Sequence, residues 1–124
     1  MNRKQISTVM LAKSFASNTD VEWSDDINVS HPISRIEVEL LSVEDNEVAR
    51  EDDTNFNLFL YSTIQPGKMG VCNVLSRHPI TSVFQFRAPR MLQGSFQFHL
   101  QDDIHRLHET NEPMSVVVKI TCYE

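Results

Sequence analysis

Glycine is scarce in this chain, with three residues in 124: Gly67, Gly70 and Gly94. A phosphate-binding loop needs several closely spaced glycines, so the sequence contains no such loop. The Gly-x-Ser-x-Gly sequence that exposes the nucleophile of many hydrolases is also absent. These absences remove two common catalytic motifs, and we do not expect the protein to be an enzyme.

Cysteine is equally scarce. Cys72 and Cys122 lie 50 positions apart, and neither has the paired spacing that metal sites use. Each stands in an apolar, strand-like run, so we expect two buried thiols that act as small hydrophobic side chains. A disulfide between them is the alternative if the protein enters an oxidising compartment.

Long apolar runs are missing as well. No stretch approaches the roughly 18 apolar residues that a membrane span requires, so we expect no membrane span. The N-terminus carries two positive charges, but polar residues interrupt the segment from Ile6 to Phe15, which makes a poor signal-peptide core. We therefore expect a protein that is synthesised in the cytoplasm and is not secreted through a signal peptide.

Positive charge is in deficit, with 11 basic against 17 acidic residues and a formal net charge of −6. Proteins that bind nucleic acid without sequence preference are usually basic, because they replace the counterions of the phosphate groups. We therefore expect no nucleic-acid partner. The acidic residues between positions 44 and 53 lack the central glycine and regular spacing of a calcium loop, so we interpret them as a solvated connection.

What the sequence has instead is an alternation of apolar and polar residues. In the segment 95–101, Phe96, Phe98 and Leu100 alternate with polar residues, as in a strand with one buried face. The segment 115–123 has the same period and is rich in β-branched residues, which favour strands. Further alternating segments occur at 33–41, 56–63 and 82–87.

About eight short strands and no long helix are expected, which predicts an all-β fold, either an antiparallel sandwich or a barrel. A chain of this length forms one domain, residues 16–124, and residues 1–15 form either an N-terminal arm or its first strand. Proline, glycine and paired acids mark the expected ends of strands and turns. These are Asp25-Asp26, Pro32, Gln65-Pro-Gly67, Arg77-His-Pro79 and Ala88-Pro-Arg90.

Five residues are candidates for contacts with another molecule. Phe59 and Tyr61 face outward from the segment 56–63, whose two faces are both partly apolar, as in a strand covered by a neighbour. Trp23 is the only tryptophan and is expected at the core or its rim. Arg87 and Arg90 lie near turns, where they form either a basic patch for an acidic partner or scattered surface charge.

Potential metal ligands gather in the segment 102–109, where His105 and His108 stand three positions apart, after His99. Histidines three apart share a face only on a helix, and zinc needs three or four converging ligands. We therefore expect no metal and no cofactor, and His105 and His108 are the candidates if a metal does bind.

The last two expected strands lie within Gly94-Ser-Phe-Gln-Phe-His-Leu-Gln-Asp-Asp103 and Asn111-Glu-Pro-Met-Ser-Val-Val-Val-Lys-Ile-Thr-Cys-Tyr-Glu124. Together these segments resemble the end of single jelly-roll capsid proteins of tailless double-stranded DNA viruses, the lineage that includes virophages and polinton-like viruses. In these penton and minor capsid proteins, a strand ending in an acidic turn is followed by a loop and a closing apolar strand. The connection 102–107 departs from many of them because it has no glycine.

The resemblance implies a single jelly-roll β-sandwich that acts as a structural virion protein. Such a subunit assembles with copies of itself, as a pentamer or trimer, and with other capsid proteins, and it performs no catalysis. The alternative that the strand pattern leaves open is a β-sandwich binding module, which recognises a glycan or a protein ligand through its loops.

Overall fold

The computed structural model describes residues 4–45, 57–73, 78–102, 106–107, 109–110 and 112–124. Within these residues the regular structure consists of strands, and the prediction of an all-β fold is confirmed. The strands are β1 (Gln5–Phe15), β2 (Thr19–Asp20), β3 (Glu22–Asp26), β4 (Val29–Asp45), β5 (Asn57–Ser62), β6 (Gln65–Asn73), β7 (His78–Leu92), β8 (Ser95–Gln101), β9 (Glu109–Thr110) and β10 (Met114–Tyr123).

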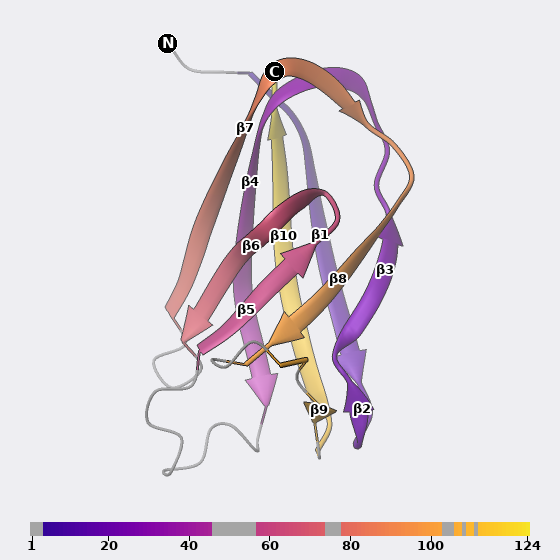
Figure 1. Cartoon of the computed structure of the whole chain (residues 1–124), viewed down its shortest axis with the longest axis vertical. Coiled ribbons are helices and arrows are strands. Elements are labelled where there is room, and N and C mark those ends of the chain that lie inside the picture. Colours follow the sequence, from indigo (N-terminus) through magenta and orange to yellow (C-terminus); the bar gives the residue numbers. More distant parts are fainter. Residues whose placement is uncertain (1–3, 46–56, 74–77, 103–105, 108, 111) are drawn as a thin grey trace.

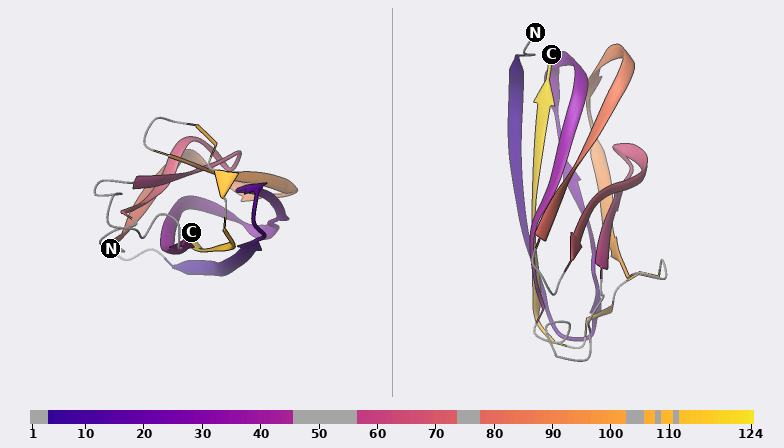
Figure 2. Two further views of the ribbon diagram at one scale, coloured as in Figure 1. Left: turned by 90° about the horizontal axis from the view of Figure 1, so that it is seen from below. Right: turned by 90° about the vertical axis from the view of Figure 1, so that its left-hand side faces the viewer.

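Eight of these strands form one antiparallel sheet in the order β1-β10-β4-β7-β6-β5-β8-β3. The long strands β4 and β7 curve over one end of the molecule, so that the sheet folds back on itself (Figure 1). The two resulting layers are β1-β10-β4-β7, the back layer, and β6-β5-β8-β3, the front layer (Figure 2). The short strands β2 and β9 pair with each other.

This strand order is that of a single jelly roll. Consecutive strands of the large sheet cross from one layer to the other, except for the hairpin of β5 and β6, which stays in the front layer. Two antiparallel four-stranded layers wound in this way form the double Greek key of a jelly roll. The predicted antiparallel β-sandwich is therefore confirmed.

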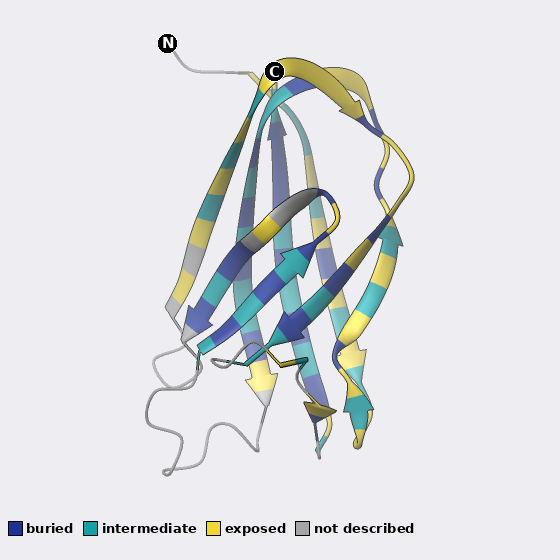
Figure 3. Ribbon diagram, viewed as in Figure 1, coloured by how far each residue is buried: buried dark blue, intermediate teal, exposed yellow. Residues whose placement is uncertain are grey.

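The core lies between the two layers and follows the alternation in the sequence (Figure 3). Phe98 and Leu100 of β8 are fully buried, and Val118 and Ile120 of β10 are fully buried in the opposite layer. Burial of such side chains stabilises the fold by about 1.5–3 kcal/mol each. The alternating faces predicted for these strands are thus confirmed.

The first strand of the chain pairs with the last strand. Residues 5–15 form β1, which pairs with β10 of the same chain from Gln5 opposite Tyr123 to Phe15 opposite Met114. Beyond the ladder, the amide of Glu124 donates to the carbonyl oxygen of Lys4 at 2.8 Å. The two termini consequently lie at the same end of the molecule (Figure 1).

The predicted turn at Gln65-Pro-Gly67 is wrong by two residues. The turn between β5 and β6 consists of Thr63 and Ile64, and residues 65–67 already belong to β6. The hydroxyl of Ser62 accepts a hydrogen bond from the amide of Ile64 at 3.1 Å, which stabilises a tight turn.

Two of the strand ends predicted at proline are also wrong. Pro32 lies inside β4 and Pro89 lies inside β7, so neither Pro32 nor Ala88-Pro-Arg90 ends a strand. The strand end predicted at Arg77-His-Pro79 lies close to the observed one, because β6 ends at Asn73 and β7 begins at His78, with residues 74–77 outside the described residues. Proline is tolerated where a ladder is irregular or one-sided. The register between β4 and β7 shifts on both sides of Ile33, next to Pro32. Pro79 pairs with β6 and precedes the part of β7 that pairs with β4, so it has a partner strand on one side.

The strand expected to break at Asp25 and Asp26 ends two residues later than predicted, because both acids belong to β3 and Asp26 is its last residue. β3 is the last strand of the sheet, where one side of the backbone faces water and charged side chains are tolerated.

Candidate interaction surfaces

Side chains join the two end strands, β1 and β3, across the open side of the sandwich. Lys13 of β1 donates to Asp25 of β3, with 2.9 Å between Nζ and Oδ1. Beside this ion pair, the ring centroids of Phe15 and Trp23 are 5.8 Å apart, and Trp23 stacks on Phe98 at 5.3 Å. Among the described residues, β1 and β3 are not joined by backbone hydrogen bonds. The side chains of this cluster therefore close the core between the two strands.

Trp23 therefore packs inward, as the core or rim position expected from the sequence requires. Its stacking on the buried Phe98 gives the residue a structural role within the chain. A role of Trp23 in contacts with another molecule stays a prediction.

Phe59 and Tyr61 lie on the outer face of the front layer, half-buried between neighbouring strands. Tyr61 stands opposite His99 of β8, and their rings stack with centroids 5.4 Å apart and planes 10° apart. Phe59 stands opposite Gln101, whose amide nitrogen lies 3.0 Å from Nε2 of His99. Tyr61, His99 and Gln101 therefore form one group on the outer face of the front layer.

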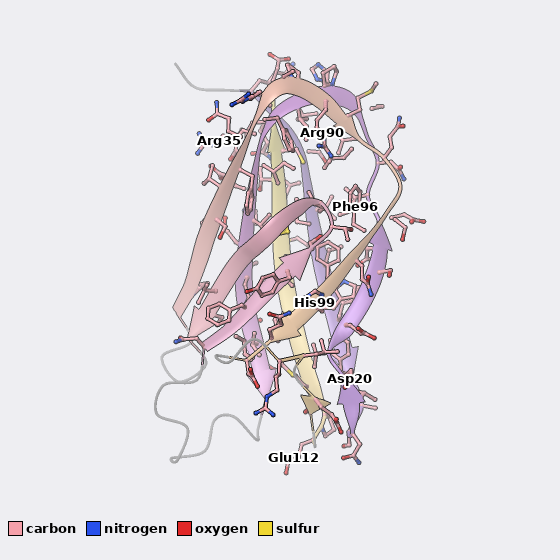
Figure 4. All side chains as sticks on the ribbon, in the orientation of Figure 1. Asp20, Arg35, Arg90, Phe96, His99 and Glu112 are labelled. Atoms are coloured by element: carbon pink, nitrogen blue, oxygen red, sulfur yellow. The ribbon has the colours of Figure 1, made fainter. Side chains whose placement is uncertain are left out.

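Arg87 and Arg90 lie in a different place, on the exposed, curved part of β7. The guanidinium carbon of Arg90 lies 4.7 Å from the centroid of the Phe86 ring, a cation–π contact. Figure 4 shows Arg90 near the end that holds the termini and His99 in the other half of the molecule. The structure therefore does not bring the five candidate residues together into one site.

The outer face of the back layer carries a polar network that the sequence analysis did not identify. Arg35 and Glu37 form an ion pair at 2.7 Å, and the hydroxyl of Tyr123 donates to Glu37 at 3.1 Å. The Arg35 guanidinium lies 5.7 Å from the centroid of the Tyr123 ring. Partial burial, followed by the hydrogen bond and the negative charge of Glu37, raises the pKa of Tyr123.

The metal candidates His105 and His108 lie outside the residues that the structure describes. Among the described residues, no three of the histidine, cysteine, aspartate and glutamate side chains gather closely enough to hold a metal ion. His99, the third histidine of the group, is engaged with Tyr61 and Gln101 on the front layer.

Both cysteines lie in the core as thiols, as the sequence predicts. Burial raises the pKa of Cys122 from 9.0 to about 11. A thiol with such a pKa is almost entirely protonated near neutral pH, and the thiolate is the reactive form.

Three large apolar side chains are exposed on the described surface. These are Met10 (55% exposed), Val83 (50%) and Met91 (49%). Met10 and Val83 lie on the outer face of the back layer, on β1 and β7. The alternation with buried neighbours could have identified Met10 as well, once the inward face of β1 was known.

No family model and no curated protein matches the chain. A solved structure of YPM, a mitogen derived from Yersinia pseudotuberculosis, is similar to this chain with a TM-score of 0.37 and 6% sequence identity. That similarity covers 94% of this chain and 85% of the other. A similarity this low says nothing about what the chain does.

One further property bears on membranes. In the part of the chain that the structure describes, no helical segment has the length and hydrophobicity of a membrane span.

Proposed function

We propose that the protein is a structural subunit of a viral capsid, of the penton or minor capsid type, which acts through contacts with other subunits and without catalysis. The strand order carries this proposal. The two segments with the capsid resemblance contain β8 and β10, which occupy inner positions of the front and the back layer of a complete jelly roll. Jelly rolls of this kind include the domains of viral capsids.

The outer surfaces of both layers support such a role. Phe59 and Tyr61 on the front layer, and Met10 on the back layer, present apolar or aromatic side chains away from a core that is already filled. Aromatic residues and methionine are enriched in protein–protein interfaces. A subunit held in a shell buries such side chains against its neighbours.

The partners proposed for this function are copies of the same chain, as a trimer or pentamer, and other capsid proteins. The location proposed is the virion, after synthesis in the cytoplasm of the host cell. Nucleic acid is not among the proposed partners, because the net charge of −6 opposes contact with phosphate groups.

Absolute mass tests the proposal. We expect light scattering after size exclusion, at increasing protein concentration, to reveal a discrete trimer or pentamer of the 14.3 kDa chain. A monomer at every concentration, which also fails to join particles formed with other shell proteins, contradicts the proposal.

A second candidate is a binding module that recognises a glycan. The group on the front layer favours it, because Phe59 and Tyr61 offer aromatic surface beside the polar side chains of His99 and Gln101. Aromatic rings that pack against a ligand, with a few polar groups that orient it, are typical of binding sites. This surface lies on a sheet face, whereas the sequence analysis expected a site in the loops.

Glycan binding has its own test. Under this candidate, a glycan array should identify a saturable ligand, and Phe59→Ala should weaken its binding about ten-fold or more, the equivalent of about 1.4 kcal/mol. Val83→Ala, on the back layer, serves as the matched control and should leave binding unchanged. If no glycan is retained by the wild-type protein, this candidate is wrong.

A further inference from the structure

β1 is a long strand at the end of the sheet. It pairs with β10 on one side, and the strand order places no strand on its other side among the described residues. Backbone groups of an antiparallel strand point alternately to its two sides. About half of the amide and carbonyl groups of β1 therefore face away from the sheet, where a further strand could pair with them.

The composition of β1 does not oppose such pairing. Lys13 is the one charged residue among its eleven, and the ammonium group is held by Asp25 on the inner side of the strand. The outward side chains are Thr8, Met10, Ala12 and Ser14, which are exposed and uncharged. The strand contains neither proline nor glycine, and its register with β10 is regular from Ser7 to Phe15.

The other end of the sheet is very different. Three of the five residues of β3 are acidic: Glu22, Asp25 and Asp26. Proteins usually protect an edge strand from pairing with another chain by charge, proline or a bulge. β3 has the protection by charge, whereas the regular part of β1 has neither proline nor a bulge, and its one charge, Lys13, is paired with Asp25 of the same chain.

We propose that β1 pairs with β1 of a second copy of this chain, antiparallel and around a two-fold axis that passes through Met10. Met10 is the middle residue of β1, and 55% of it is exposed. With the axis at this position, each Met10 lies opposite Met10 of the second copy, and Thr8 lies opposite Ala12. Each methionine side chain then covers part of the apolar surface of the other on the outer face of the joined layer.

The charges fit this register. Lys13 lies opposite Ser7 of the second copy, so that no two like charges face each other across the axis. The two Lys13 residues are six positions from direct opposition, a separation of about 20 Å along the strands. Like charges directly opposite in a strand pair are destabilising, so this register avoids the main electrostatic cost.

The same strand in both copies is the best occupant of this edge, because a two-fold contact is self-complementary. Pairing β1 with β1 overlaps the strands along their full length and joins the back layers into one sheet, β7-β4-β10-β1 followed by β1-β10-β4-β7. No unpaired β1 edge then remains. This dimer contact goes beyond the proposed trimer or pentamer, and it does not depend on the capsid function.

A charge at the axis tests the contact. Sedimentation of the wild-type protein should reveal a dimer that dissociates on dilution, and Met10→Lys should raise its dissociation constant about ten-fold or more, because the two lysines face each other. The matched control is Val83→Lys, which makes the same kind of change at an equally exposed residue of the same layer, away from the axis. Circular dichroism verifies that both variants are folded.

A cysteine at the axis tests the register. Directly opposed residues of an antiparallel pair have Cα atoms about 4.5–5.5 Å apart, which suits a disulfide. Met10→Cys should therefore form a covalent dimer under mild oxidation, while Val83→Cys should not. The native cysteines are buried and should not contribute in the folded protein.

The outcomes separate this inference from the proposed function. A dimer that Met10→Lys dissociates, together with the disulfide of Met10→Cys, supports the pairing of β1 with β1. A wild-type protein without a dimer, or cross-linking that is equal in Met10→Cys and Val83→Cys, overturns it. A wild-type trimer or pentamer that does not pair further, and whose mass Met10→Lys leaves unchanged, supports the capsid proposal and refutes the edge contact.

Discussion

At the residue scale, Cys122 is the clearest case of a side chain whose chemistry is set by burial. It lies on β10 with none of its surface exposed, opposite Ile36 of β4 and Ser7 of β1. The surrounding core disfavours the charged thiolate and raises the pKa of Cys122 to about 11. The unfolded chain, by contrast, releases the thiol proton at about the ordinary value of 9.0.

We predict that the folded state loses stability as the pH rises above about 9. The stabilisation linked to the Cys122 proton is complete below that pH and is lost between about 9 and 11, because the unfolded state releases the proton first. One proton corresponds to a slope of about 1.4 kcal/mol per pH unit. Urea unfolding between pH 7.5 and 10.5 measures it, with Cys122→Ala as the comparison.

The variant should have a shallower decline of unfolding free energy with pH than the wild-type protein. Tyr123 has a raised pKa as well, and its contribution of the same sign remains in both proteins. Equal slopes in the two proteins contradict the prediction.

The sequence predicted most individual positions correctly where a strand has one buried and one wet face. Phe96, Phe98 and Leu100 are buried as their alternation indicates. It did not predict that Tyr61 stacks on His99, because nothing in a local pattern tells which two strands become neighbours. The ion pair of Lys13 with Asp25 was missed for the same reason.

At the element scale, the seam between β1 and β3 depends on side chains. Lys13 and Asp25 lie on strands in different layers, and both side chains are largely removed from water. An ion pair in such a partly buried place holds the two edges of the sandwich together without a backbone ladder.

We predict a favourable coupling between Lys13 and Asp25 of about 0.5–1 kcal/mol, the upper part of the range for partly exposed pairs. The measurement is a double-mutant cycle of Lys13→Met and Asp25→Asn in urea unfolding. As a control, the cycle of Lys13→Met with Asp26→Asn should give no coupling, because Asp26 faces away from the seam. A coupling as large for Asp26 as for Asp25 would mean that net charge alone acts.

Strand boundaries were the least predictable part of the elements. Proline and paired acids were expected to interrupt strands, but β4 and β7 continue through prolines, and β3 includes both Asp25 and Asp26 before it ends. Whether a proline breaks a strand depends on the hydrogen bond that its missing amide would have made. Whether this hydrogen bond would be needed depends on the register of the strand and on whether it lies at an edge of the sheet. The local sequence does not specify either.

At the scale of the whole molecule, the fold is closed by contacts between the two ends of the chain. β1 covers one side of β10, whose sequence is rich in valine and poor in charge. β1 therefore protects a strand that would otherwise be an apolar edge.

We predict that removal of residues 1–15 leaves a chain that self-associates. Without β1, the edge of β10 is open, and an apolar edge strand with low charge readily pairs with other chains. Light scattering and the soluble fraction after expression measure the effect, and removal of residues 1–3, which precede β1, is the control. A truncated chain that associates no more than the wild-type protein and keeps the wild-type unfolding midpoint contradicts the protective role of β1.

The sequence by itself determined the all-β class, the buried face of the main strands and the burial of both cysteines, because these depend on local alternation and hydrophobicity. Only the tertiary structure decided the order of the strands, the continuation of β4 and β7 over the end of the molecule, and the stacking of Tyr61 on His99. It also decided that β1 stands at an edge of the sheet, with its one charge, Lys13, paired with Asp25. Pairing between strands is made by contacts distant in sequence, and these arise only when the whole chain is folded.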